Sequence, residues 1–400
     1  MTIQATSPSA PRVERPARSS FLNDPDKRGY IIQAVLLVLV VAFIWWLGHN
    51  TAQNLQRLHI ASGFGFLNER AGFNIGQSLI PYSGDRSYGY ALLVGIINTI
   101  EVAILGIVIA TIVGVLVGVG RLSSNWLIRQ LATVYVELFR NIPPLLVIFF
   151  WYFGVLAVLP NPRDAINLGL GFSLSNRGLF TPKPIFEHGA LYVGIAILVG
   201  IVAAWALSRW ATARQMRTGQ QFPSFWAGLA VIVVLGAASF AATGAPLHFD
   251  IPVKTRFNLN GGSQLGPELV SLLLALAIYT ASFIAEIVRA GILSVSHGQT
   301  EAAYSLGLKV GPTMRKIILP QALRVVIPPL TSEYLNLMKN TSLAVAIGFA
   351  DLVAVGGSIL NQTGQSVEVV LIWMLVYLGL SLIMAVLMNW YNRKMALVER

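Results

Sequence analysis

Long apolar runs divide this 400-residue chain and constrain its fold more than any other feature. A helix needs about 20 mostly apolar residues to cross the hydrocarbon layer of a bilayer. Only 11% of the residues are charged, whereas about 25% are charged in a typical soluble domain. The sequence therefore predicts an all-α, polytopic membrane protein. About eight transmembrane helices are expected, over residues 30–48, 90–119, 133–159, 190–208, 225–243, 267–292, 328–350 and 368–390.

The distribution of basic residues predicts the orientation of these helices. Eight spans put both termini on one side of the membrane, and that side holds most of the 28 lysines and arginines. Because short cytoplasmic loops are enriched in Lys and Arg, we expect both termini in the cytoplasm. Residues 1–29 lack the apolar core of a signal peptide and are predicted to be a disordered cytoplasmic arm. A short cytoplasmic tail is expected at 393–400.

The sequence pattern changes between residues 161 and 266, and this segment is predicted to be a two-helix insertion. Turn-forming sequences frame it, among them Pro160-Asn-Pro162 and Asn260-Gly-Gly262. Residues 30–89 are predicted to be an additional N-terminal helix followed by a long periplasmic loop, which either lies at the membrane interface or is a plain loop. Charges and prolines inside spans occur in residues 90–160 and 267–392, so function is expected there.

A charge inside the hydrocarbon layer costs about 2.5 to 3.5 kcal/mol on insertion scales and needs a partner or a purpose. Glu137 and Arg140 are three residues apart, as are Glu286 and Arg289, so each pair is predicted to share a helix face. Both pairs are either structural or part of a substrate path. The candidate path residues are Asn98, Glu101, Arg140, Asn141, Glu286, Lys339, Asn340, Thr341 and Ser342.

Two proline pairs, Pro143–Pro144 and Pro328–Pro329, occur inside predicted spans. Broken helices are tolerated at membrane depth where protein or water satisfies the freed backbone groups, and such breaks often frame transport sites. Proline is also harmless at the first position of a helix, so both interpretations stay open. Gly114 and Gly118 have the spacing that lets two helices pack closely.

Several kinds of chemistry have no support in the sequence. There are no cysteines, and the five histidines have no metal-ligand spacing. No Gly-x-x-x-x-Gly-Lys-Ser/Thr loop occurs, so the chain is not expected to hydrolyse ATP itself. No nucleophile and base set stands out, and the basic residues form no nucleic-acid-binding stripe. We therefore expect no enzyme activity, no metal and no cofactor in this chain.

One polar segment, expected in the cytoplasm over residues 294–325, carries a spaced motif. It reads Glu301-Ala302-Ala303, then Gly307, Ile317, Leu319 and Pro320, and it resembles the signature loop of permease subunits of binding-protein-dependent ABC importers. Asn98-Thr-Ile-Glu101 and Lys339-Asn-Thr-Ser342 resemble polar amino-acid permeases. The extra helix and the insertion are similar to the long permeases of general L-amino acid and glutamate/glutamine/aspartate/asparagine transporters of Gram-negative bacteria.

This resemblance implies a type I ABC importer permease core of five helices, divided between residues 90–160 and 267–392, in the bacterial inner membrane. It implies that the 301–320 loop couples to a separate ATPase dimer, which binds ATP and Mg. The other implied partners are a second permease subunit (a paralogue or a second copy), a periplasmic amino-acid-binding protein, an L-amino acid substrate and membrane lipids. Ala303 and Gly307 are expected to give the loop helix a face without bulk, Glu301 to lie early in that helix, and Gly311-Pro312 to force a turn.

The alternatives are an ion-gradient-driven secondary transporter or channel, and a membrane scaffold without transport activity. Intramembrane charges alone suit a secondary transporter, but neither alternative has a use for a docking loop.

Overall fold

The computed structural model describes residues 25–57, 62–256 and 258–395. The chain forms two compact units, one of residues 1–63 and 363–365 and the other of residues 64–362 and 366–400. In the first unit, helix α1 (Pro25–Arg57) contains a run long and apolar enough to span a membrane. Residues 25–29 of the predicted arm are therefore helical. The rest of that arm, and residues 396–400 of the predicted tail, lie outside the described residues.

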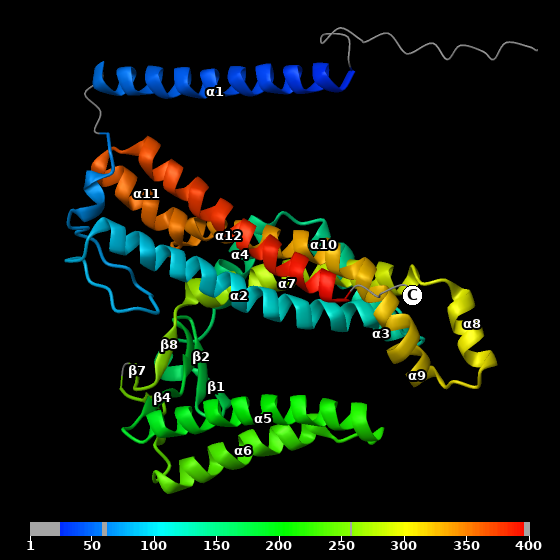
Figure 1. Cartoon of the computed structure of the whole chain (residues 1–400). Helices are drawn as coiled ribbons and strands as arrows, with labels where there is room; N and C mark the ends of the chain where they lie inside the picture. Colours follow the sequence, from blue (N-terminus) through cyan, green and yellow to red (C-terminus); the bar gives the residue numbers. More distant parts are fainter. Residues whose placement is uncertain (1–24, 58–61, 257, 396–400) are drawn as a thin grey trace, which may run out of the picture. The chain divides into compact units, whose positions relative to one another are not determined.

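Long helices packed along one another form the core of the second unit (Figure 1). They are α2 (Tyr88–Gly120), α7 (Pro267–Leu293), α10 (Leu319–Asn340) and α12 (Ser366–Met395). Helix α7 is the central one, and its side chains Leu276 and Ile284 are fully buried, as is Leu337 of α10. The predicted all-α membrane fold is confirmed. Among the described residues, six helices can cross a membrane, or eight if two bent pairs are counted as single spans.

Helices α2 and α7 pack closely because of the glycines on α2. A Cβ atom added at Gly114 would lie 2.6 Å from the Cβ of Ile284, and one added at Gly118 would lie 2.7 Å from the carbonyl oxygen of Ala285. The predicted close approach at this glycine pair is therefore confirmed. It fixes the spacing of the helix that carries Glu101 and the helix that carries Glu286 and Arg289.

The two proline pairs behave differently. Helix α3 (Trp126–Arg140) and helix α4 (Pro144–Phe149), which continues as a π-helix over Phe150–Leu156, meet at 109°. The predicted single span 133–159 is thus wrong, because Pro143 and Pro144 begin a new helix. Pro328 and Pro329 lie inside α10 and do not interrupt it.

The break in the last part of the core comes after α10. A 3-10 helix, Thr341–Ile347, follows α10 directly, and α11 (Leu352–Thr363) leaves at an angle of 51°. Gly348 ends the 3-10 helix with a φ of 78°, a conformation that costs glycine little. The predicted span 328–350 is therefore interrupted after Asn340, within the polar run Lys339-Asn340-Thr341-Ser342.

The segment before α2 is packed, rather than a plain loop or an interfacial helix. It contains one short 3-10 helix, Gly65–Asn68, in which Phe66 is buried. Phe66, Ala71 and Tyr88 belong to a small apolar cluster with Leu352 and Val355 of α11. The segment therefore caps one end of the core.

The insertion contains the two predicted helices, α5 (Ala190–Thr218) and α6 (Ser224–Ala242), which pack on each other. It also contains short strands that were not predicted. Strands β1 (Ile166–Gly169), β2 (Phe172–Ser175), β3 (Gly178–Thr181) and β8 (Ser263–Leu265) form one antiparallel sheet; β4 (Lys183–Phe186) pairs with β5 (Leu247–Asp250), and β6 (Val253–Lys254) with β7 (Leu259–Asn260). This small β module leads directly into the start of α7 (Figure 1). We call this end of the core the sheet end, and the opposite end, where α2 and α7 finish, the α8 end.

Candidate functional site

The segment between α7 and α10 is an ordered helical element. Helix α8 (His297–Ser305) and helix α9 (Val310–Thr313) are followed by a π-helix, Met314–Ile318, that runs into α10. Figure 1 shows α8 and α9 projecting from the α8 end of the core. Gly307 has a φ of 76°, and its N–H donates to the carbonyl oxygen of Tyr304 while the N–H of Leu308 donates to that of Ala303. This pair of bonds is a Schellman ending, which reverses the chain after α8.

The predicted coupling residues take different positions in this segment. Glu301 lies in the middle of α8, with its carboxylate 3.0 Å from Nδ1 of His297, so it does not cap the first turn. Ala302 is exposed, whereas Ala303 is only 1% exposed. The predicted helix face shared by Ala303 and Gly307 does not form, because Gly307 lies beyond the end of α8 and reverses the chain. Ile317 is half-buried.

Leu319 and Pro320 begin α10 directly after the π-helix. Gly311 and Pro312 lie inside α9. The predicted turn at this pair is therefore wrong, since the chain reverses earlier, at Gly307. Three exposed apolar side chains of the segment lie outside the motif: Tyr304, Leu306 and Val310, of which Leu306 is 81% exposed.

An ion-pair cluster holds the helices together at the α8 end. Arg289 donates from Nη2 to Oε1 of Glu286 at 2.6 Å, as the three-residue spacing predicts. Arg121, at the end of α2, contacts the other oxygen of Glu286, and its Nη2 lies 3.7 Å from Oε1 of Glu137 in α3. The Arg121 side chain is only 11% exposed. The cluster therefore ties α2, α3 and α7 together through one guanidinium group that the sequence did not point to.

The second predicted pair, Glu137 with Arg140, does not form. The guanidinium carbon of Arg140 lies 5.6 Å from the centre of the Phe283 ring on α7, which is the geometry of a cation–π contact. Arg140 also interacts electrostatically with Glu286 and with Glu333 of α10. The Nδ2 of Asn141 donates to the carbonyl oxygen of Glu137 and closes the end of α3.

A stripe of polar residues runs along the outward face of α10. Ser332, Asn336 and Lys339 are all exposed and recur every three or four residues, which places them on one face. Glu333 and Asn340 beside them are half-buried, as is Glu101 of α2. Within the described residues, no hydrogen bond or ion pair reaches the carboxylates of Glu101 and Glu333. The α10 stripe, defined as Ser332, Asn336 and Lys339, thus faces away from this chain's own core.

Two predicted path residues instead belong to a buried polar cluster at the break after α10. Asn98 donates from Nδ2 to the carbonyl oxygens of Gln77 and Ala350, each at 2.9 Å. The Thr341 hydroxyl donates to the carbonyl oxygen of Met338, and Tyr377 donates to Asp351 at 3.4 Å. Ser342, one residue after Thr341, is bound to the carbonyl oxygen of Lys339. Asn98 and Thr341 therefore stabilise backbone groups freed by the break.

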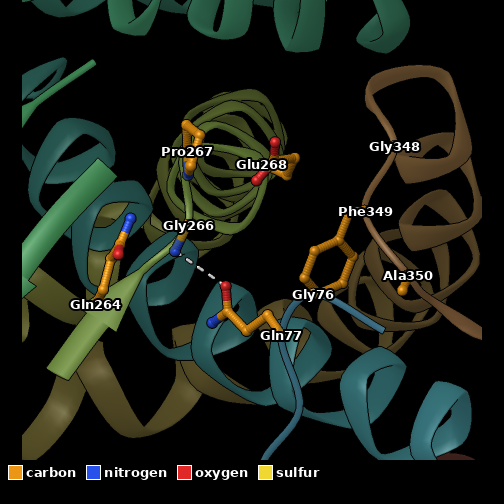
Figure 2. A pocket seen from close by; sticks show the side chains of 9 residues that line it. All are labelled: Gly76, Gln77, Gln264, Gly266, Pro267, Glu268, Gly348, Phe349 and Ala350. Atoms are coloured by element: carbon orange, nitrogen blue, oxygen red, sulfur yellow. Dashed lines mark hydrogen bonds between the residues drawn. The ribbon is translucent and has the colours of Figure 1, made fainter. Parts of the chain in front are cut away.

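A polar cavity of about 470 Å³ lies at the sheet end, between the start of α7 and the segment Gly348–Ala350. Figure 2 shows Gln77, Glu268 and Phe349 around it, with Oε1 of Gln77 accepting from the N–H of Gly266 at 3.0 Å. Tyr152 donates to Oε1 of Glu268 at 3.2 Å. Sequence reasoning missed this cavity, because Gln77 lies in the segment before α2, which carries no motif.

The predicted path residues are thus brought to three places: the ion-pair cluster with Arg140, the α10 stripe, and the buried polar cluster at the break. A helical membrane core with an ordered segment projecting between two of its helices is the architecture of a transporter's membrane subunit. Residues 196–397 match the family described as "Binding-protein-dependent transport system inner membrane component". The chain belongs to this family of multi-pass transport permeases.

The curated relatives cover almost the whole chain. It is 59% identical over 381 residues to the general L-amino acid transport system permease protein AapQ of Rhizobium johnstonii, covering 95% of each protein. It is 49% identical over 385 residues to the amino-acid ABC transporter permease YhdX of Escherichia coli K12, covering 95% of this chain and 97% of the relative. To the glutamate/glutamine/aspartate/asparagine transport system permease BztB of Rhodobacter capsulatus it is 42% identical over 414 residues, covering 96% and 97%.

A crystal structure of an amino acid ABC transporter with histidines is similar at a TM-score of 0.45 and 21% identity, over 77% of this chain and 95% of that one. The resemblance to ABC amino-acid permeases that the motifs predicted is confirmed by the curated relatives. The ion-gradient-driven alternative has no support from them.

Proposed function

We propose that this chain is the membrane permease subunit of an ATP-driven, binding-protein-dependent importer of L-amino acids, in the bacterial inner membrane with both termini in the cytoplasm. The substrate class is supported by the names of its relatives, which transport general L-amino acids or glutamate, glutamine, aspartate and asparagine. The α8 end then faces the cytoplasm, and the sheet end faces the periplasmic binding protein.

The observation that carries the proposal is the exposed surface of Tyr304, Leu306 and Val310 on the ordered segment between α7 and α10. Large apolar side chains exposed close together in sequence on a projecting segment favour a protein contact. The sequence has no phosphate-binding loop of its own. The partner at this surface is therefore the ATPase subunit, which binds ATP and Mg.

The test is co-purification of the chain with the ATPase encoded beside it. Leu306→Asp places a charge in the proposed contact and is expected to abolish co-purification and ATP-driven uptake. Leu170→Asp is the matched control, because Leu170 is 92% exposed in the β module and is expected to leave ATPase binding unchanged. Normal ATPase binding by the Leu306→Asp variant would show that the segment does not couple to the ATPase.

A second permease subunit is proposed to cover the α10 stripe. Polar side chains on an outward helix face in a membrane require protein or a water-filled cavity beside them. Both of the Escherichia coli glutamate/aspartate import permeases, GltJ and GltK, are similar to this chain, which supports a paralogue as the partner. The substrate path then runs between the two subunits, along the α10 stripe and Glu333.

An L-amino acid presents a carboxylate and an ammonium group, and the side chains beside this path complement both. Lys339 is proposed to bind the carboxylate and Glu333 the ammonium group. Loss of one charge-assisted hydrogen bond of about 1.5 kcal/mol corresponds to roughly tenfold in affinity. Lys339→Gln is expected to raise the substrate concentration for half-maximal uptake about tenfold, with normal assembly; Arg217→Gln, at an exposed position in the last turn of α5, is the control. Equal uptake kinetics in both variants would remove Lys339 from the path.

A further inference from the structure

The lengths of α5 and α6 indicate where this helical hairpin leaves the hydrocarbon layer of the membrane. Helix α5 runs for 29 residues from Ala190, whereas about 20 residues at 1.5 Å each cross a hydrocarbon layer of roughly 30 Å. Counted from its start at the sheet end, α5 therefore leaves the hydrocarbon near Arg209. Helix α6 has 19 residues and begins at Ser224, so Ser224 lies at the same level. Both ends are on the membrane side that carries α8.

A groove of about 440 Å³ lies between the two helices at this level. The helices meet beside it, since a Cβ atom added at Gly228 would lie 3.1 Å from the Cβ of Ala204. Toward the boundary the groove is lined by the hydroxyl-bearing residues Ser208 and Ser224, and toward the membrane interior by Leu229 and Ile232. It is polar at one end and apolar at the other.

Positive charge gathers at the polar end. The guanidinium of Arg209 lies 5.1 Å from the centre of the Trp205 ring, which itself lines the groove. No Asp or Glu occurs in the sequence between residues 188 and 249. Trp205, Phe225 and Trp226 are exposed around the groove, as aromatic side chains are at the membrane interface.

We propose that this groove binds one anionic phospholipid from the leaflet on the α8 side. The phosphate of the headgroup binds Arg209 and the hydroxyls of Ser208 and Ser224, and an acyl chain lies along Leu229 and Ile232. Basic pockets between membrane helices are recognised binding sites for anionic headgroups. A soluble anion would leave the apolar end of the groove empty, and an apolar partner helix would leave Arg209 without a counter-charge. An anionic phospholipid fits both the polar and the apolar end.

The inference rests on the membrane-spanning hairpin and not on the proposed coupling or substrate path. Its test therefore has a readout separate from transport. The full-length chain, alone and in its complex with partner subunits, is titrated with phosphatidylglycerol or phosphatidylcholine in detergent and examined by native mass spectrometry. One phosphatidylglycerol is expected to bind in both samples, in preference to phosphatidylcholine.

Arg209→Gln removes the headgroup charge and is expected to weaken phosphatidylglycerol binding about fivefold, since one basic residue near a headgroup contributes on the order of 1 kcal/mol. Arg214→Gln is the matched control. Arg214 also stacks on a tryptophan, but that residue, Trp210, does not line the groove, and Arg214 donates to Oε1 of Gln220. Equal losses in the two variants would show a diffuse basic surface and overturn the proposal.

The acyl-chain part has its own test. Leu229→Trp fills the groove and is expected to weaken phosphatidylglycerol binding, whereas Val233→Trp, on an exposed position of α6 outside the groove, is not. Displacement of the lipid by millimolar inorganic phosphate would instead reveal a simple anion site. Binding by the isolated chain but not by the complex would show that a partner subunit covers the groove. Either result would overturn the proposal.

Discussion

Two glycines in the segment between α7 and α10 differ in backbone conformation but not in the space around them, so substitutions at the two positions can be compared. Gly307 has a φ of 76°, whereas Gly311 has an ordinary helical conformation, and a Cβ atom would meet nothing within 4 Å at either. A left-handed conformation costs a residue with a Cβ atom about 1 to 2 kcal/mol. We expect Gly307→Ala to distort the reversal after α8 and to lower the amino-acid uptake driven per ATP hydrolysed, and Gly311→Ala to leave it unchanged. Equal coupling ratios in reconstituted vesicles would contradict this role.

Arg121 gives a second prediction for a single residue. Its guanidinium side chain is only 11% exposed and pairs with Glu286, so Arg121→Gln removes one of the cations around that carboxylate and leaves Arg289 and Arg140. Removing one partner of a largely buried ion pair destabilises a fold more than removing one partner of an exposed pair, and we expect a clear loss of thermal stability in detergent. Glu137→Gln is the control, because its 3.7 Å contact with Arg121 involves an exposed carboxylate and such pairs contribute less than about 1 kcal/mol. A Glu137→Gln variant as unstable as Arg121→Gln would refute this ranking.

Helical spacing correctly predicted one of the two ion pairs that it suggested. The Glu286–Arg289 pair follows from helical spacing alone. Arg121 could not be assigned as the partner of Glu286, because the two are 165 residues apart and only the packing of α2 on α7 brings them together. The same spacing failed for Glu137 and Arg140, since Arg140 turns to Phe283 instead. Local spacing predicts which side chains share a helix face, but it does not predict which side chains on other helices they contact.

At the level of elements, the close contact between α2 and α7 depends on glycines of α2, which have no side chain to push α7 away. A Cβ atom at Gly114 would meet Ile284 at 2.6 Å, while one at Gly120 of the same helix would make ordinary contacts at 3.6 Å. Both Gly→Ala changes gain the same helix propensity, so their difference reports the clash. Overpacking costs about 1 to 3 kcal/mol, so Gly114→Ala is expected to lower the melting temperature relative to Gly120→Ala. Equal melting temperatures would mean that α7 moves aside freely.

The sequence predicted elements well where a run was long and apolar, and poorly where it was short or mixed. Helices α2, α5, α6, α7 and α12 follow directly from their apolar runs. The strands of the β module have two to four residues each, which is too short for an alternating pattern to be distinguished from a loop. Proline could not locate the breaks by itself, because it begins α4 but is accommodated within α10.

At the scale of the whole permease, the polar features lie at opposite ends of the core. The ion-pair cluster and the projecting α8 belong to one end, and the cavity of Gln77 and Glu268 belongs to the other. The cluster ties α2, α3 and α7 at the end where the ATPase is proposed to act, whereas the cavity is open where the binding protein is proposed to deliver substrate. The α10 stripe lies on the helix that continues directly from the projecting segment. Force on α8 therefore reaches the proposed path through a continuous backbone.

This arrangement requires the two ends to face opposite sides of the membrane, and the chain is suited to a direct test because it has no cysteine. Single cysteines are introduced as Leu306→Cys in the α8 segment and Leu170→Cys in the β module, both at strongly exposed positions. In spheroplasts, a membrane-impermeant maleimide is expected to label the Leu170→Cys chain and to spare the Leu306→Cys chain. Inverted vesicles are expected to give the reverse, with permeabilised cells as the control for reactivity of both. Labelling of both positions from one side would place the two ends on the same side of the membrane. That result would contradict both the proposed cytoplasmic coupling surface and the proposed periplasmic opening of the cavity.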